Sequence, residues 1–227
     1  MKRHHRIGGV SVVALCAGLL VASASSATTI WISASSARTS LAATSLAPSW
    51  RAIWPVTPST SGYASPVLAA RGFAVSLLHM NSPVVGTFSP RSATTGVVSV
   101  RYSAQSLATY VHVTQFTGAK GWWVVSSTTR DIDLTSPVAL ASVTSPLTLT
   151  GTSIAFEAVV NISLFVDGRS TALVSSSTKG GGTQMAPFHA TLHFSNDVHR
   201  YATLIMYTRS MKDGRTVVAT ARRILLK

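Results

Sequence analysis

The stretch that decides the fold spans residues 145–168 and reads SPLTLTGTSIAFEAVVNISLFVDG. From residue 158 to residue 166, apolar side chains alternate with polar ones, which is typical of a β-strand with one buried face. The Asp167-Gly168 pair that follows is a hairpin signal. Another alternating run begins earlier in the stretch, and we expect Gly151 to interrupt it. The stretch therefore predicts neighbouring antiparallel strands.

The same periodicity continues to the end of the chain. Asp213-Gly214 marks a second turn, and residues 180–182 form a glycine loop between two further runs. About six or seven short strands separated by polar turns are typical of an immunoglobulin-like β-sandwich, which we predict for residues 138–227. The predicted strands outside the opening stretch are residues 172–176, 188–194, 201–207 and 217–226.

Residues 62–135 predict a small α+β domain. Ser65 and Pro66 are a typical helix N-cap and first helical residue, and apolar residues at helical spacing continue to Leu78. Strand-like runs follow at residues 97–102, 108–116 and 122–126, and the two glycines before the last run favour a hairpin. One helix on a short antiparallel sheet would bury these faces, with Trp122 and Trp123 on opposite faces of their strand. The whole chain is predicted to be mainly β.

The first 61 residues predict export. Residues 1–27 have the basic start, apolar run and small-residue cleavage site of a signal peptide, and residues 28–61 form a linker rich in Ser, Thr, Ala and Pro. Retention of the leader as a membrane anchor, or lipidation at Cys16, are the alternatives. Because Cys16 is the only cysteine, the mature chain would have no disulfide. The predicted location is the cell envelope or the extracellular space.

The charge of the chain is strongly basic and unevenly distributed. Nineteen Lys and Arg face six acidic residues, and the net charge is +13. All six acidic residues lie after residue 130. This balance suits an anionic envelope polymer, or simply reflects a chain with few charges. No nucleic-acid-binding motif is present, so the open question is whether the scattered basic residues of the first half gather on one surface. Those residues are Arg71, Arg91, Arg101 and Lys120.

The sequence predicts no metal, cofactor or catalytic site. Asp131 and Asp133 share a strand face but are too few for Ca²⁺, which takes six or more oxygen ligands. His189 and His193 lie about 13 Å apart on a strand, too far to share one ion. The glycine loop lacks the Lys-Ser/Thr of a phosphate-binding loop, and no G-x-S-x-G motif occurs. A Ser-His-Asp triad assembled from distant residues stays open.

The second half contains five ordered motifs: an SP pair with a following glycine, an FE pair, a VDG turn, a strand entered at phenylalanine, and an S-x-x-DG turn before the last strand. Together these motifs resemble the immunoglobulin-like domain of bacterial spore germination proteins. The resemblance implies an extracytoplasmic binding or assembly module with no established catalytic residues. The chain departs from the family at Ala158, where a glycine usually follows FE. The matching residues are Ser145, Pro146, Gly151, Phe156, Glu157, Phe188, Ser210, Asp213 and Gly214.

These observations predict a non-enzymatic binding module that contacts a protein or an anionic cell-wall polymer. We expect Glu157, the only glutamate, to accept hydrogen bonds at a strand start, with a contact to a partner as the alternative. Two other functions remain open. One is a hydrolase or transferase of wall polymer with a site between the predicted domains, and the other is a structural spacer on a retained membrane anchor.

Overall fold

The computed structural model describes residues 50–55, 61–169, 171–195 and 199–227, all of which belong to one compact unit. The predicted signal peptide and most of the predicted linker lie outside these residues, so both stay predictions. No helix in the described part is long and apolar enough to cross a membrane.

Helix α1 (Pro66–Ser76) begins where the sequence predicts. The Ser65 side chain accepts a hydrogen bond from the Leu68 amide at 3.2 Å, and Pro66 occupies the first helical position. The helix ends earlier than the apolar pattern suggests, because Leu77 and Leu78 both donate to the Phe73 carbonyl and the chain then turns at His79, whose φ is 56°. The two leucines remain buried beyond the end of the helix.

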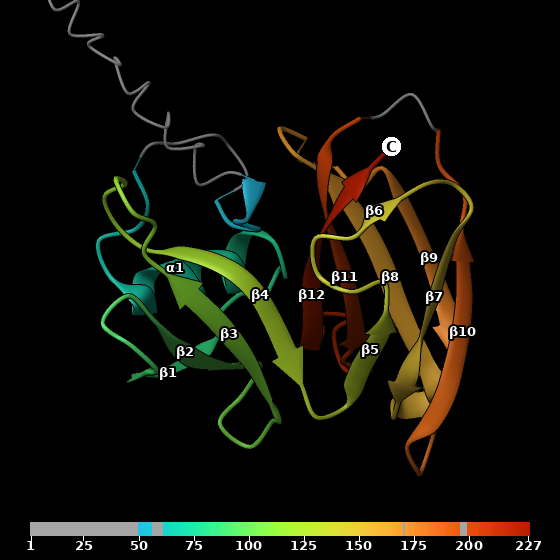
Figure 1. Cartoon of the computed structure of the whole chain (residues 1–227). Coiled ribbons are helices and arrows are strands. Elements are labelled where there is room, and N and C mark those ends of the chain that lie inside the picture. The colour runs from blue at the N-terminus through green and yellow to red at the C-terminus, as the bar shows by residue number, and fades with distance from the viewer. Residues whose placement is uncertain (1–49, 56–60, 170, 196–198) are drawn as a thin grey trace, which may run out of the picture. The chain divides into compact units, whose positions relative to one another are not determined.

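A nine-stranded sheet forms the frame of the molecule (Figure 1). Its strands follow the order β1-β2-β3-β4-β12-β11-β8-β9, and the short β6 pairs with β12 in parallel. Their bounds are β1 (Val84–Pro90), β2 (Thr95–Arg101), β3 (Ala108–Thr114), β4 (Trp123–Thr129), β6 (Ser142–Val143), β8 (Val159–Val166), β9 (Val174–Lys179), β11 (Tyr201–Arg209) and β12 (Thr216–Leu226).

A second, three-stranded sheet has the order β10-β7-β5, with β5 (Ile132–Ser136), β7 (Leu147–Ser153) and β10 (Ala186–Leu192). In Figure 1 these strands lie together beside the C-terminal strands of the larger sheet. The two sheets give the β-sandwich-like arrangement that the strand pattern predicts. A single 3₁₀ turn, Phe156–Ala158, leads from β7 into β8.

Gly151 does not interrupt its strand, and this expectation was wrong. Strand β7 runs straight through the residue, which pairs with Phe188 on β10 and with Leu134 on β5. A Cβ atom at Gly151 would lie 2.0 Å from the Asp133 carbonyl oxygen and 2.7 Å from the Phe188 ring. The glycine is needed because a neighbouring backbone and an aromatic ring occupy the space of a side chain.

Two hydrophobic cores lie on opposite faces of the large sheet. Leu204 and Met206 of β11 belong to the core under the small sheet, whereas Ile205 belongs to the core under α1. Adjacent strand residues point to opposite faces, so α1 and the small sheet cover the two faces of one sheet. The two tryptophans behave as predicted: Trp123 is buried against Phe116, while Trp122 packs with the α1 core.

The large sheet includes strands from both predicted domains. β4 meets β12 at the Ser127–Ala221 pair, so the helix-bearing part and the sandwich part share one sheet. Around this pair, hydroxyl groups replace backbone partners: Ser127 donates to the Ala219 carbonyl, and the Ala219 amide donates to Thr109, both at 3.0 Å. The predicted division describes two parts of the sequence that are joined at this seam.

Candidate functional site

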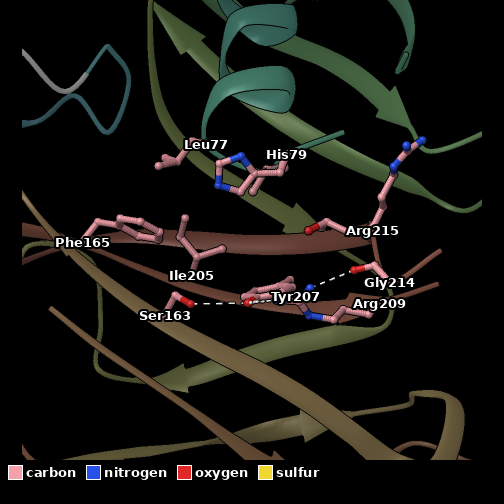
Figure 2. Close-up of a pocket in the computed structure, with 11 residues that line it drawn as sticks. Leu77, His79, Ser163, Phe165, Ile205, Tyr207, Arg209, Gly214 and Arg215 are labelled. Carbon is pink, nitrogen blue, oxygen red and sulfur yellow. Dashed lines mark hydrogen bonds between the residues drawn. The ribbon is translucent and has the colours of Figure 1, made fainter. Parts of the chain in front are cut away.

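One cavity lies between the end of α1 and the adjoining face of the large sheet (Figure 2). Its volume is about 240 Å³. Leu77 and His79 lie on one side, and Phe165, Ile205 and Tyr207 lie across from them. The volume is below the roughly 300–1,000 Å³ of pockets that hold drug-sized ligands. An apolar group the size of one or two side chains fits this space.

The polar groups of this cavity largely satisfy one another. Arg209 donates to the Tyr207 hydroxyl at 3.0 Å and to the Gly214 carbonyl at 2.8 Å, and the Ser163 hydroxyl lies 3.5 Å from the Tyr207 hydroxyl. His79 and Ser163 both line the cavity, but no Asp or Glu is among its described lining residues. No sequence pattern predicts this set, because its members come from segments far apart in the chain.

The FE pair occupies a tight left-handed turn. Glu157 has φ 54° and ψ 19°, and Ala158 has φ 60°. Backbone bonds on both sides fix the turn: the Ala158 amide donates to Ala155 at 2.9 Å, and the Gly180 amide donates to Ala158 at 2.9 Å. Because left-handed backbone favours glycine, Ala158 holds a conformation that its side chain disfavours.

Both side chains of the FE pair point outward. Phe156 is 64% exposed, and Glu157 is exposed with no hydrogen-bond or ion-pair partner among the described residues. The expected hydrogen bonds from Glu157 to a strand start are therefore not part of this fold. Residues 180–185 form the neighbouring loop, in which Met185 is 46% exposed. We call this turn and loop together the FE apex; it lies at the lower end of the sandwich in Figure 1.

The next matching residues lie inside the framework of the small sheet. The Ser145 hydroxyl accepts a hydrogen bond from the Phe194 amide at 2.9 Å, which fastens the entry of β7 to the exit of β10. Pro146 follows through a cis peptide and precedes the first residue of β7. Phe188 is 4% exposed and lies over Gly151. Each of these residues contacts the protein interior or its backbone.

Ser210, Asp213 and Gly214 form the turn between β11 and β12. The Ser210 and Asp213 side chains accept from the amides of Lys212 and Arg215, and Gly214 has φ 71°. Asp213 also accepts from the Tyr102 hydroxyl at 2.8 Å, which links this turn to the β2–β3 connection. These bonds, with Tyr102 first among them, lower the pKa of Asp213.

The acidic and histidine pairs do not assemble a metal site. Asp133 is exposed on β5, and Asp131 is half-buried, so that desolvation raises its pKa while the Arg130 charge opposes the shift. His189 is exposed on β10 and His193 is exposed beyond its end. In the described part of the chain, no three His, Cys, Asp or Glu side chains come together as metal ligands.

Sequence reasoning missed a buried ion pair between Arg223 and Asp167. The Arg223 side chain is 2% exposed, pairs with Asp167 through both carboxylate oxygens, and stacks 5.2 Å over the Tyr201 ring. An arginine near the chain end and an aspartate in a hairpin turn give no local sign of pairing. The pair joins β12 to the β8–β9 turn and is structural in this arrangement.

Comparison with known proteins identifies part of the chain. No curated protein and no solved structure matches it. A family model does match, over residues 131–215, which include β5, the FE apex and the S-x-x-DG turn but end just before β12. The matched family is described as Gmad2, the immunoglobulin-like domain of bacterial spore germination. Residues 131–215 therefore carry a Gmad2 immunoglobulin-like domain.

Proposed function

We propose that the chain is an exported, non-enzymatic binding module of the cell envelope, and that it holds a partner protein through the FE apex. The observation that carries this proposal is the exposed Phe156 on a rigid left-handed turn within the family domain. Backbone in sparsely populated regions persists where the surrounding structure holds it, and such sites often serve binding.

The chemistry of the apex defines the partner. An exposed phenylalanine on fixed backbone loses little conformational entropy when it enters an apolar pocket, which is the usual form of an interface anchor. Glu157 lies beside it, exposed and without a hydrogen-bond or ion-pair partner among the described residues, in a strongly basic protein. The partner surface is therefore an apolar pocket with a Lys or Arg at its rim.

The cavity beside α1 supports binding more than catalysis. A hydrolase or transferase acting on wall polymer, the alternative function, would need an acid–base pair or an activated nucleophile in that cavity. Its described lining contains His79 and Ser163 without a carboxylate, and Glu157 is not among the lining residues. The proposed module therefore acts through surface contacts.

Crosslinking in envelope fractions tests the apex. We expect a defined protein to be retained by the unmodified chain, to be lost with Phe156→Ala, and to be weakened about tenfold with Glu157→Gln, a typical loss for one charged contact. Met211→Ala is the matched control, because Met211 is 67% exposed on a different turn. Equal retention by Phe156→Ala and Met211→Ala would refute the proposal.

N-terminal sequencing of the exported protein tests the location and the spacer alternative. A secreted module begins after Ala24 or Ala27, the predicted cleavage positions. A chain that keeps its leader and stays with the membrane would instead fit a spacer on an anchor. Recovery of the chain in the cytoplasm alone, with its leader intact, would contradict export.

A further inference from the structure

The face of β2, β3 and β4 that lies opposite α1 has its own chemistry. Val98, Val111 and Val124 belong to the α1 core. Their strand neighbours point the other way, and the register aligns them in rows across the three strands. We call this second face the basic face. Its central rows are Val97–His112–Ser126 and Ser99–Tyr110–Thr128.

One end of the basic face holds a cavity of about 440 Å³. Arg51, Arg91 and His112 line it, together with the hydroxyl side chains Thr95, Thr114, Thr117 and Ser126 and the amide of Gln115. Arg51 stacks 5.3 Å over the Trp50 ring, and Arg91 is exposed. Burial, and to a lesser extent the nearby Arg91 charge, lower the pKa of His112.

The other end of the basic face holds a second, smaller basic cavity. Its volume is about 200 Å³, and it is lined by Arg101, Tyr110 and Arg130 among others. Arg101 donates through one nitrogen to the Ser106 carbonyl at 2.8 Å, and Arg130 is exposed beside Asp131. No acidic residue is among the described lining residues of either cavity. Both cavities therefore present guanidinium groups suited to an anion.

The separation of the two cavities sets the size of the ligand. Thr95 lines the first and Arg101 the second, at opposite ends of β2. Six residues of extended strand span about 20 Å, too far for one small anion. Between them lie the side chains of Ser99 and Thr128, and Tyr110 borders the second cavity. We propose that the basic face binds an extended polymer whose phosphodiester charges occupy both cavities. Hydroxyl groups of the polymer contact the two central rows of side chains between the cavities.

The composition of the face favours a polyol phosphate over nucleic acid. Single-stranded nucleic acids are usually held by several aromatic side chains on which successive bases stack. Tyr110, 40% exposed, is the one Phe, Tyr or Trp side chain of the two central rows, and Phe116, which lines the first cavity, is half-buried against Trp123, itself only 2% exposed. The other polar groups there are the His112 imidazole, which lies 3.2 Å from the Thr128 hydroxyl, and the hydroxyls of Ser99, Ser126 and Thr128, which match the hydroxyls of a polyol. The site is separate from the FE apex, so the proposal stands independently of the proposed function.

Binding of poly(glycerol phosphate) to the full chain tests this proposal, with affinity measured as a function of salt. Arg91→Gln and Arg101→Gln each remove one contact at opposite ends, and each should weaken binding about tenfold. Together they should reduce the slope of log affinity against log salt by about 1.4. Each phosphate contact contributes about 0.7 to this slope on single-stranded nucleic acid, the comparable flexible polyphosphate. Inorganic phosphate should compete only weakly.

The control removes the same charge elsewhere. Arg71→Gln on α1 combined with Arg169→Gln in the β8–β9 turn also lowers the net charge by two, and both residues are exposed. Affinity and salt slope should stay unchanged in this variant. Thermal unfolding of every variant checks that folding is intact. The exposed substitutions should stay within about 0.5 kcal/mol of the unmodified chain's stability, whereas Arg101→Gln also loses a half-buried bond to the Ser106 carbonyl, which costs about 0.5–1.5 kcal/mol.

Several results would overturn the proposal. An equal loss of affinity in the Arg71/Arg169 control would show that net charge alone explains the binding. Loss with Arg91→Gln but not with Arg101→Gln, combined with strong competition by inorganic phosphate, would indicate a site for one phosphate group. Tighter binding of oligo-dT, or of phosphatidylglycerol vesicles, through the same arginines would assign the face to nucleic acid or to membrane.

Discussion

Ala158 stands where the motif resemblance leads to an expectation of glycine, and its backbone explains the consequence. Its φ of 60° lies in the left-handed region, where a side chain costs about 1–2 kcal/mol. Glycine would remove this cost but adds about 0.5–1 kcal/mol of unfolded-state entropy. We therefore expect Ala158→Gly to stabilise the chain by about 0.5–1 kcal/mol, measured by denaturant unfolding.

A control separates the backbone effect from a general effect of glycine. Ala172→Gly changes a half-buried alanine that is not among the positive-φ residues, and it should destabilise the chain. Destabilisation by Ala158→Gly as well would mean that the left-handed turn is not under strain.

Strand β7 shows how one residue determines an element. In Gly151→Ala, the new Cβ would meet the Asp133 carbonyl and the Phe188 ring, so β5 and β10 would have to move apart. Overpacking of this kind costs about 1–3 kcal/mol, and we expect the loss in stability to reach the upper part of that range. Chemical denaturation measures it, and the exposed neighbour Thr148→Ala is the control.

Unchanged stability in Gly151→Ala would mean that β7 has room to shift in the small sheet. Combining it with Phe188→Leu identifies the source of the strain, because the smaller side chain leaves space for the new methyl group. If the ring contributes to the clash, the double variant should lose less stability than the sum of the two single variants.

Elements with local chemistry could be predicted from the sequence, and elements defined by their neighbours could not. Ser65-Pro66, Asp167-Gly168 and Asp213-Gly214 each carry a turn or cap signal within two residues, and the structure confirms the helix start and both turns. Strand β1 was missed because it is a mostly exposed strand at the sheet edge, with Gly86 inside it. Gly151 was misinterpreted because the ring and carbonyl that require it belong to other strands.

The same contrast between local signals and distant neighbours applies to the candidate sites. The motif residues could be located in the sequence, but the exposure of Phe156 and Glu157 could not, since an alternating pattern does not show which way a left-handed turn faces. The cavities beside α1 and on the basic face combine residues from segments far apart in the chain. Their composition follows from strand order, which no local pattern specified.

The seam between β4 and β12 determines how the whole molecule unfolds. Thr109 and Ser127 are buried there and bond the Ala219 backbone, so the helix-bearing part and the sandwich part stabilise each other. We expect one cooperative transition, with the same midpoint by tryptophan fluorescence, which reports on the helix-bearing part, and by far-ultraviolet circular dichroism, which reports on all strands.

Thr109→Val leaves the Ala219 amide unpaired and should cost about 1–3 kcal/mol of stability. Both midpoints should shift together, whereas Thr191→Val, exposed on β10, should leave them in place. Two separate midpoints would show that the seam does not couple the parts.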